Sequence, residues 1–339
     1  MSNEMNLSSY EDSVRLSKQT DGKQNRYSPY CDLIYYPSTR NPELTLAMLV
    51  FKPAEPSYIV ATTHGWHMSI DQFREYDEPK SKYLRIAVDM RGRAFSDGCQ
   101  DCNGWELYDV IDAIEYAKKM YADYIIDPDT VYFEAGSGGG GNAYAIAGKF
   151  PDYFAHVTAM CGMSDYALWY RNDKVGEFQD ELVVWIGDIE NEQAYRSRSG
   201  IALVENLTAP MCITHGETDI RVPVYHARNY IEAATKCGKG ELISYMELPG
   251  VGAQGHWDGA TRELLDKMEA FCEAGRQQKR TPTELPRQGE LVVGGYLFTR
   301  HFSVIMNNID RVARVKYDLD AKTFEVIGAT AEEYELKVY

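Results

Sequence analysis

The sequence contains no run of about 18 consecutive apolar residues, so we expect no membrane-spanning helix. Residues 1–7 lack the basic stretch followed by an apolar run that marks a secretory signal, so we expect no signal peptide. Basic residues are outnumbered, 35 against 51 acidic ones, which gives a formal net charge of −16. Because such a chain repels phosphate groups, we expect neither a nucleic-acid partner nor a membrane partner.

Cysteine motifs are also scarce. The seven cysteines are odd in number and scattered along the chain, and only Cys99 and Cys102 have a Cys-x-x-Cys spacing. A structural zinc site would need a second such pair. The simplest interpretation is reduced thiols in a cytoplasmic protein, with no metal and no cofactor.

The most informative stretch is 130–142. It begins with β-branched and aromatic residues typical of a buried strand, turns through glycines, and leads into a helical segment at 143–150. Ser137 stands at the apex of the turn, with the small residues Ala135 and Gly139 two positions before and after it. This pattern is typical of a nucleophile elbow, which places a strained serine between a strand and a helix. A phosphate-binding loop is the alternative, but the Gly-Lys-Ser/Thr ending of such a loop is missing.

Short apolar segments alternate with helical ones along most of the chain. Because this alternation is typical of parallel strands covered by helices on both faces, we predict an α/β fold with a mostly parallel central sheet. The first two strands are separated by a turn signal and are expected to form an antiparallel hairpin. The predicted strands lie at 32–37, 45–51, 58–63, 83–89, 130–134, 155–161, 210–215 and 242–248. The predicted helices lie at 105–121, 143–150, 223–237 and 260–274.

In such a sheet, chemistry takes place beyond the carboxyl ends of the strands. The polar residues that follow predicted strands, and that we expect to converge there, are His64, Asp89, Ser137, Asp219 and His256. A serine hydroxyl needs a histidine to accept its proton and an acid to orient that histidine. We predict Ser137 as the nucleophile, Asp219 as the acid and His256 as the base, which is the chain order of α/β-hydrolases. Taken singly, Asp219 could instead cap a helix, and His256 could be a surface loop histidine.

Cleavage of an acyl bond also needs N–H donors for the negative oxygen of the intermediate. We predict the backbone N–H of Gly138, directly after the nucleophile, and that of Trp66, in the loop after the strand at 58–63. His67 follows in this loop and is expected at the substrate pocket. The alternative interpretation of His64 and Gly65 is an ordinary turn.

A set of motifs in this order resembles the α/β-hydrolase superfamily, and within it the catalytic domain of the prolyl oligopeptidase (S9) family and related esterases. The resemblance extends over about residues 58–272 and implies serine hydrolase chemistry on an ester or amide. The motifs are His64-Gly65, Asp89–Gly92, Ser96–Gly98, Gly136–Asn142, Tyr195–Ser199, His215–Pro223 and Gly255-His256.

Three features differ from the families that the chain resembles. Only about 30 residues precede the first predicted strands, too few for the N-terminal propeller of the oligopeptidases. The residue after Ser137 is Gly138, where those peptidases often have a tyrosine. Dienelactone hydrolases have a similar layout with cysteine at the elbow, where this chain has serine. The first two features reduce the expectation of peptidase activity.

Changes in composition along the chain predict four segments. Residues 1–28 are polar and aperiodic and are expected to be an N-terminal arm, whereas 29–275 contain the hydrolase motifs. A proline-bearing linker is predicted at 276–288. A small antiparallel β appendage with sheet edges that need covering is predicted within 289–339, with a hairpin turn at 318–322. Its five expected strands lie at 291–293, 296–298, 304–306, 312–317 and 323–327. It would pack on the hydrolase domain or pair with another subunit in a homo-oligomer.

An insertion at 163–200 is rich in aromatic and charged residues and is expected to lie over the end of the sheet like a lid. We predict that Trp169, Tyr170 and Trp185 contribute to the substrate pocket there. The alternative is that these rings pack helices on the sheet.

The expected function is cleavage of a small ester or a short peptide through an acyl-enzyme. We favour a carboxylesterase or deacetylase, because an alkoxide leaving group needs less help from a general acid than an amine does. Acids of the insertion, Glu177, Asp180 and Glu181, could instead bind a peptide amine, as an S9-type aminopeptidase would require. A non-catalytic binding protein of the same fold is a third alternative, although such proteins usually lose a triad residue or an oxyanion donor.

Overall fold

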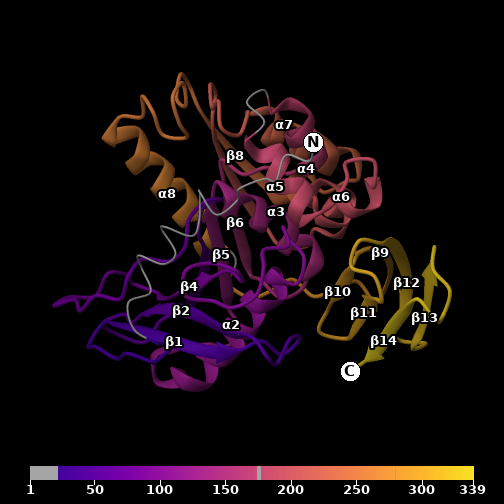
Figure 1. Ribbon diagram of the computed structural model, residues 1–339, viewed down its shortest axis with the longest axis horizontal. Coiled ribbons are helices and arrows are strands. Elements are labelled where there is room, and N and C mark those ends of the chain that lie inside the picture. The colour runs from indigo at the N-terminus through magenta and orange to yellow at the C-terminus, as the bar shows by residue number, and fades with distance from the viewer. Residues whose placement is uncertain (1–21, 174–176, 279) are drawn as a thin grey trace, which may run out of the picture.

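The computed structural model describes residues 22–173, 177–278 and 280–339. They form an eight-stranded sheet surrounded by helices and, toward the C-terminus, a separate six-stranded sheet (Figure 1). Most of the predicted N-terminal arm lies outside the described residues. Its described end includes Arg26, which forms an isolated bridge with Leu33 of the first strand. Among the helices of the described part, none is long and apolar enough to cross a membrane.

The large sheet is parallel except at one edge. Its strand order is β1-β2-β4-β3-β5-β6-β7-β8, in which the β1–β2 and β2–β4 pairs are antiparallel and the later pairs are parallel. The predicted α/β class with a mostly parallel sheet is confirmed. The strands are β1 (Cys31–Pro37), β2 (Thr45–Phe51), β3 (Ile59–Thr63), β4 (Leu84–Asp89), β5 (Val131–Gly136), β6 (His156–Met160), β7 (Met211–Gly216) and β8 (Ile243–Leu248).

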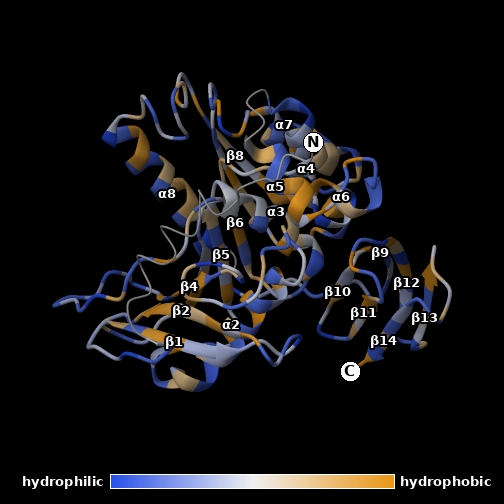
Figure 2. Cartoon of the chain, in the orientation of Figure 1, coloured by the Kyte–Doolittle hydropathy of each residue, from blue (hydrophilic) through white to orange (hydrophobic). Residues whose placement is uncertain are grey.

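Helices cover both faces of this sheet. Ile114 of α2, Ile146 of α3 and Tyr230 of α7 belong to one hydrophobic core with the strands. On the opposite face, Gly275 of α8 lies against His156 and Cys212, so close that a Cβ on this glycine would collide with both side chains. These helices are α2 (Glu106–Met120), α3 (Gly138–Lys149), α7 (Tyr225–Lys236) and α8 (Arg262–Gln278); short 3₁₀ helices are η1 (Ala122–Tyr124), η2 (Gly200–Asn206) and η3 (Gly240–Leu242). The strands carry mostly hydrophobic residues and the surrounding loops mostly hydrophilic ones (Figure 2).

Three further helices lie between β6 and β7, in the predicted insertion: α4 (Tyr166–Asn172), α5 (Glu177–Trp185) and α6 (Glu192–Arg198). They have a hydrophobic core of their own that includes Trp169, Phe178 and Tyr195. Trp66, from the loop after β3, packs against this core. The insertion is therefore joined directly to a loop at the carboxyl end of the sheet.

The second sheet is wholly antiparallel, with the order β13-β12-β9-β10-β11-β14 (Figure 1). The predicted turn at 318–322 joins β12 to β13. Five strands were expected here, and β14 is an addition. The linker expected at 276–288 is shorter than predicted because α8 continues to Gln278. The strands are β9 (Gln288–Gly294), β10 (Tyr296–Phe298), β11 (Phe302–Met306), β12 (Val312–Asp318), β13 (Thr323–Ile327) and β14 (Tyr334–Val338).

This C-terminal sheet packs on α3, α6 and η2 of the larger unit. The ammonium group of Lys149, at the end of α3, donates a hydrogen bond to the Gly294 carbonyl. Asn206 of η2 exchanges two hydrogen bonds of 2.8 Å with the backbone of Val292. Arg198 of α6 forms an ion pair with Asp310 at 2.8 Å. The contacts include buried polar groups, which need these partners to offset their desolvation.

Candidate active site

Ser137 occupies a strained turn between β5 and α3. Its φ of 57° and ψ of −123° are unusual for a residue with a side chain, and such strain is typical of functional sites. Glycines allow the turn to pack closely: a Cβ on Gly140 would lie 2.7 Å from Gly162 Cα and from the Met160 carbonyl oxygen. The local sequence therefore folds as an elbow because only glycine fits behind the serine.

A continuous series of hydrogen bonds links Ser137 to two other predicted site residues. The Ser137 hydroxyl lies 2.8 Å from His256 Nε2, and His256 Nδ1 lies 2.6 Å from Asp219 Oδ2. With the proton of neutral His256 on Nδ1, the ring donates to the carboxylate and accepts from the serine. Asp219 is 82 positions after Ser137, and His256 is 37 positions after Asp219. The three residues meet because each follows the carboxyl end of a parallel strand: β5, β7 and β8, in that order.

Asp219 is fixed from its other side as well. Its Oδ1 accepts hydrogen bonds from the backbone N–H groups of Arg221 at 2.9 Å and Val222 at 3.0 Å, and only 4% of the residue is exposed. These bonds satisfy the carboxylate oxygen that does not face His256. A buried carboxylate held in this way has one orientation available toward the imidazole.

The backbone of Trp66 lies directly against the start of α3. A Cβ on Gly138 would be 2.5 Å from the Trp66 backbone nitrogen, so no larger residue fits at this point. The N–H groups of Gly138 and Trp66, the two predicted oxyanion donors, are therefore neighbours beside Ser137. Preorganised backbone donors in this arrangement stabilise negative charge on a reacting oxygen.

His64 and Asp89, which the sequence also places near the site, have their side chains engaged with the backbone. His64 Nε2 accepts a hydrogen bond from the Met90 N–H at 3.2 Å. Asp89 accepts from the N–H groups of Ile70, Phe95 and Ser96 at 2.8 to 3.1 Å. Burial raises the pKa of Asp89 to about 6, although these backbone bonds lower it. Both residues fix the loops after β3 and β4.

A pocket opens beside Gly138 and the Trp66 loop. Of the residues predicted for a pocket, Trp185 lines it, whereas Trp169 is only 3% exposed and stacks on Phe178 with ring centroids 4.1 Å apart. Tyr170 packs edge-on against Tyr195. The pocket is lined by His64, Gly65, Trp66, Met90, Arg93, Gln100, Cys102, Glu106, Gly138, Asn142, Tyr166 and Trp185.

Glu106 is a polar residue of this pocket that the sequence analysis did not single out. It accepts a hydrogen bond from the Asn103 N–H at 2.6 Å. Burial, followed by the charge of Asp101, raises the pKa of the Glu106 carboxyl to about 7. Glu106 could have been found from the sequence, because it stands beside Leu107 and Val110 on the apolar face of a predicted helix.

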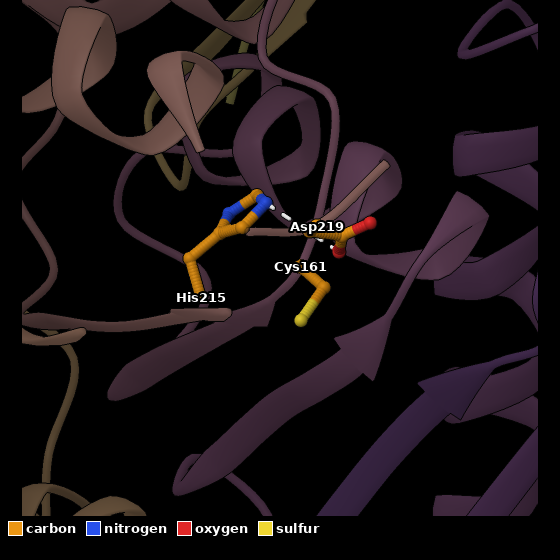
Figure 3. A group of neighbouring side chains, drawn as sticks. All are labelled: Cys161, His215 and Asp219. Atoms are coloured by element: carbon orange, nitrogen blue, oxygen red, sulfur yellow. Dashed lines mark ion pairs between the residues drawn. The ribbon is translucent and has the colours of Figure 1, made fainter. Parts of the chain in front are cut away.

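Cys161, His215 and Asp219 offer potential metal-ligand atoms within 4.8 Å of one another, and Figure 3 shows the His215 ring directed at the Asp219 carboxylate with Cys161 beside them. The atoms of His215 and Asp219 that face each other are engaged in other hydrogen bonds, however. The nitrogen of His215 nearest Asp219 is Nε2, which lies 2.7 Å from the Val222 carbonyl oxygen and donates its proton to it. Asp219 uses both oxygens, and burial raises the pKa of the Cys161 thiol. These three side chains therefore do not fit a metal ion. Cys161 and His215 pack beside the Asp219 carboxylate instead.

His67 and Glu181 are in contact beside Trp66. His67 Nε2 is 2.7 Å from Glu181 Oε1, and Glu181 is buried. Glu181 is one of the insertion acids that could have bound a substrate amine. In the structure its carboxylate contacts the loop after β3. The side chain of Glu177 lies outside the described residues.

Residues 87–274 match the model of the prolyl oligopeptidase family. One curated relative is an uncharacterized peptidase, YuxL, of Bacillus subtilis. It is 29% identical over 139 residues, which cover 41% of this chain and 21% of the relative. Another is the esterase LipQ of Mycobacterium tuberculosis, 26% identical over 156 residues, which cover 42% of this chain and 37% of the relative. Among solved structures, the acylaminoacyl peptidase of Pyrococcus horikoshii superimposes with a TM-score of 0.62 at 18% identity, covering 78% of this chain and 43% of that one.

The chain spans less than half the length of each of these relatives. The family match covers more than half of this chain, includes the elbow, and ends within α8. The shared fold and the match of residues 87–274 lead to one conclusion: the chain belongs to the prolyl oligopeptidase family.

Proposed function

We propose that this chain is a serine hydrolase that cleaves small carboxylic esters, with Ser137 as nucleophile, His256 as general base and Asp219 as the acid that orients the histidine. The strongest support is the unbroken hydrogen-bond series from Ser137 Oγ through His256 to Asp219. A strained serine at one end and a buried carboxylate at the other are what nucleophilic catalysis requires.

In the first half of the reaction, Ser137 Oγ attacks the ester carbonyl carbon while His256 Nε2 accepts the hydroxyl proton. The carbonyl oxygen becomes an oxyanion, which accepts hydrogen bonds from the backbone N–H groups of Gly138 and Trp66. His256 then gives the proton to the alkoxide as the carbon–oxygen bond breaks. The alcohol leaves, and the acyl group remains on Ser137.

In the second half, a water molecule attacks the acyl carbon while His256 accepts one of its protons. The same donors stabilise the second oxyanion. His256 returns the proton to Ser137 Oγ as the acyl bond breaks, which releases the carboxylic acid. Asp219 stays ionised throughout and stabilises the imidazolium that forms twice in each cycle.

We place the acyl group at the pocket beside Gly138, whose volume of about 20 Å³ holds about one water molecule, so only the shortest acyl chains enter it without displacement of its walls. This pocket adjoins both proposed oxyanion donors, and Trp66, Tyr166 and Trp185 supply its aromatic walls. Aromatic walls around a few polar groups are typical of small-molecule sites. We therefore expect short acyl groups to be preferred, with the alcohol portion of the ester outside this pocket.

An exopeptidase is the second candidate, because the solved relatives include an acylaminoacyl peptidase. An aminopeptidase needs an acid for the substrate amine. Glu181, an insertion acid considered for this role, already contacts the indole of Trp66 and the imidazole of His67 through its two oxygens. This observation favours the ester over a peptide with a free amino terminus.

The test compares kcat/KM for p-nitrophenyl acetate and butyrate with kcat/KM for alanyl- and prolyl-p-nitroanilide, using Ser137→Ala as the blank. We expect turnover of the esters that is lost in the variant, and weak turnover of the anilides. Efficient anilide turnover by the wild-type chain would overturn the ester assignment and support an aminopeptidase. An absence of Ser137-dependent turnover on all four substrates would favour a binding protein.

A further inference from the structure

The side chain of Glu181 lies between the insertion and the loop that follows β3. It belongs to α5, and only 1% of the residue is exposed. Oε2 accepts a hydrogen bond from the indole N–H of Trp66 at 2.5 Å. Nε2 of His67 lies 2.7 Å from Oε1 and 2.8 Å from Oε2. One carboxylate therefore holds two consecutive side chains of the loop.

The position of this loop determines where the Trp66 backbone N–H points. The loop touches the elbow at two places: a Cβ on Gly138 would lie 2.5 Å from the Trp66 nitrogen, and one on Gly65 would lie 3.8 Å from Ser137 Cβ. A shift of the loop therefore moves one proposed oxyanion donor relative to the nucleophile. Donors act only when they point at the oxygen, and a displacement of about 1 Å can cost about 100-fold in rate.

Aromatic packing alone does not explain why an acid is buried here. The Trp66 indole already contacts the rings of Trp169, Trp185 and Tyr166, with centroids 4.9, 5.2 and 5.9 Å away. Burying a carboxylate is costly, and an apolar side chain of similar volume often stabilises a fold as well or better. The carboxylate fixes the orientation of both rings, because its charge-assisted hydrogen bonds hold the indole and the imidazole in one rotamer each.

We propose that Glu181 is a positioning residue, which holds Trp66 so that the N–H groups of Trp66 and Gly138 point at the same oxyanion. The inference rests on the proposed function, and it assigns the carboxylate no contact with substrate. It also makes the insertion part of the catalytic machinery, since α5 orients the loop that follows β3.

The experiment measures kcat and KM for p-nitrophenyl acetate in Glu181→Ala and Glu181→Gln. Glu190→Gln is the matched control, because it removes the same charge from an exposed position of the same insertion. We expect Glu181→Ala to lower kcat about 10- to 100-fold with KM nearly unchanged. Glu181→Gln should recover most of the loss, because its amide oxygen still accepts from the indole N–H. Glu190→Gln should behave as wild type.

A second readout separates positioning from folding. An aryl trifluoromethyl ketone adds to the serine and places an oxyanion against the two donors, so its inhibition constant reports their alignment. We expect this constant to rise in Glu181→Ala by the same factor by which kcat/KM falls. A structural defect would reduce the number of active sites, counted with a fluorophosphonate, and leave the inhibition constant unchanged. If Glu181→Ala does not fold, Trp66→Phe removes the same hydrogen bond from the other partner.

Wild-type kcat in Glu181→Ala, or a fall in kcat without weaker ketone binding, would overturn the role of Glu181. The wild-type ester rate and its loss in Ser137→Ala test the proposed function separately. A Ser137-dependent rate with an unchanged Glu181→Ala variant would leave the hydrolase standing and remove only the positioning role.

Discussion

Tyr296 of the C-terminal sheet stacks on Trp105, just before α2, with ring centroids 4.8 Å apart and ring planes 7° from parallel. Its hydroxyl donates a hydrogen bond to the Gly104 carbonyl oxygen at 2.7 Å. Tyr296 is fully buried and belongs to the main core of the large sheet. The C-terminal sheet therefore fixes the start of α2, next to Glu106 in the pocket wall.

The first prediction concerns this contact. Tyr296→Ala should lower the free energy of unfolding by about 3–5 kcal/mol, because it removes a large buried ring. Tyr296→Phe should cost only about 1 kcal/mol, since it loses one hydrogen bond and keeps the stacking. Chemical denaturation measures both. Ile327→Ala, at an exposed site of the same sheet, is the control. Equal stability of Tyr296→Ala and the control would show that the sheet does not stabilise the larger unit.

The second prediction separates two tryptophans of the insertion. Trp185 lines the pocket, so Trp185→Ala should enlarge it and raise the butyrate-to-acetate ratio of kcat/KM about tenfold or more. Trp169 is buried in the insertion core, so Trp169→Ala should lower the melting temperature and leave the ratio nearly unchanged. The reverse pattern would assign the pocket wall to Trp169.

The third prediction is a dependence of stability on pH through His226. Burial, followed by the charge of the neighbouring His215, lowers the pKa of His226 to about 3. The unfolded chain, with an ordinary histidine pKa of about 6.5, then binds more protons than the folded one between these values. Stability from neutral His226 is present above about pH 6.5 and is lost as the pH falls toward 3.

His226→Gln removes this titration. Between pH 6.5 and pH 4 the wild type should therefore lose more free energy of unfolding than the variant does. Comparing the two proteins at each pH cancels the contribution of other groups, among them Asp89 and Glu106, whose raised pKa values act in the opposite direction. A difference that stays constant with pH would contradict a neutral buried His226.

The sequence predicted the parts of this molecule that depend on local pattern. The elbow at Ser137 is visible because glycines and a strand–helix change are local features. Asp219 and His256 could be placed because each follows a predicted strand, and the carboxyl ends of parallel strands meet at one edge of the sheet. The alternation of short apolar segments with helical ones was enough to predict the α/β class.

Features that depend on packing could not be predicted in this way. The contact between Glu181 and Trp66 joins residues 115 positions apart, and the sequence shows only an acid on a helix. Strand β14 was missed because its residues are exposed or half-buried and it contains charged residues, so its pattern resembles a loop. Trp169 and Trp185 look alike in sequence, and only the fold shows which one is buried and which one lines the pocket.

The most direct test of the central assignment is covalent labelling with a fluorophosphonate, followed by mass spectrometry of the digested protein and by ester turnover of the same sample. The account predicts one adduct per chain, located on Ser137, with turnover falling in proportion to labelling. Ser137→Ala should take up no label and lose several orders of magnitude in kcat, because the triad acts as a unit. An adduct on another residue, or ester turnover retained by Ser137→Ala, would contradict the assignment.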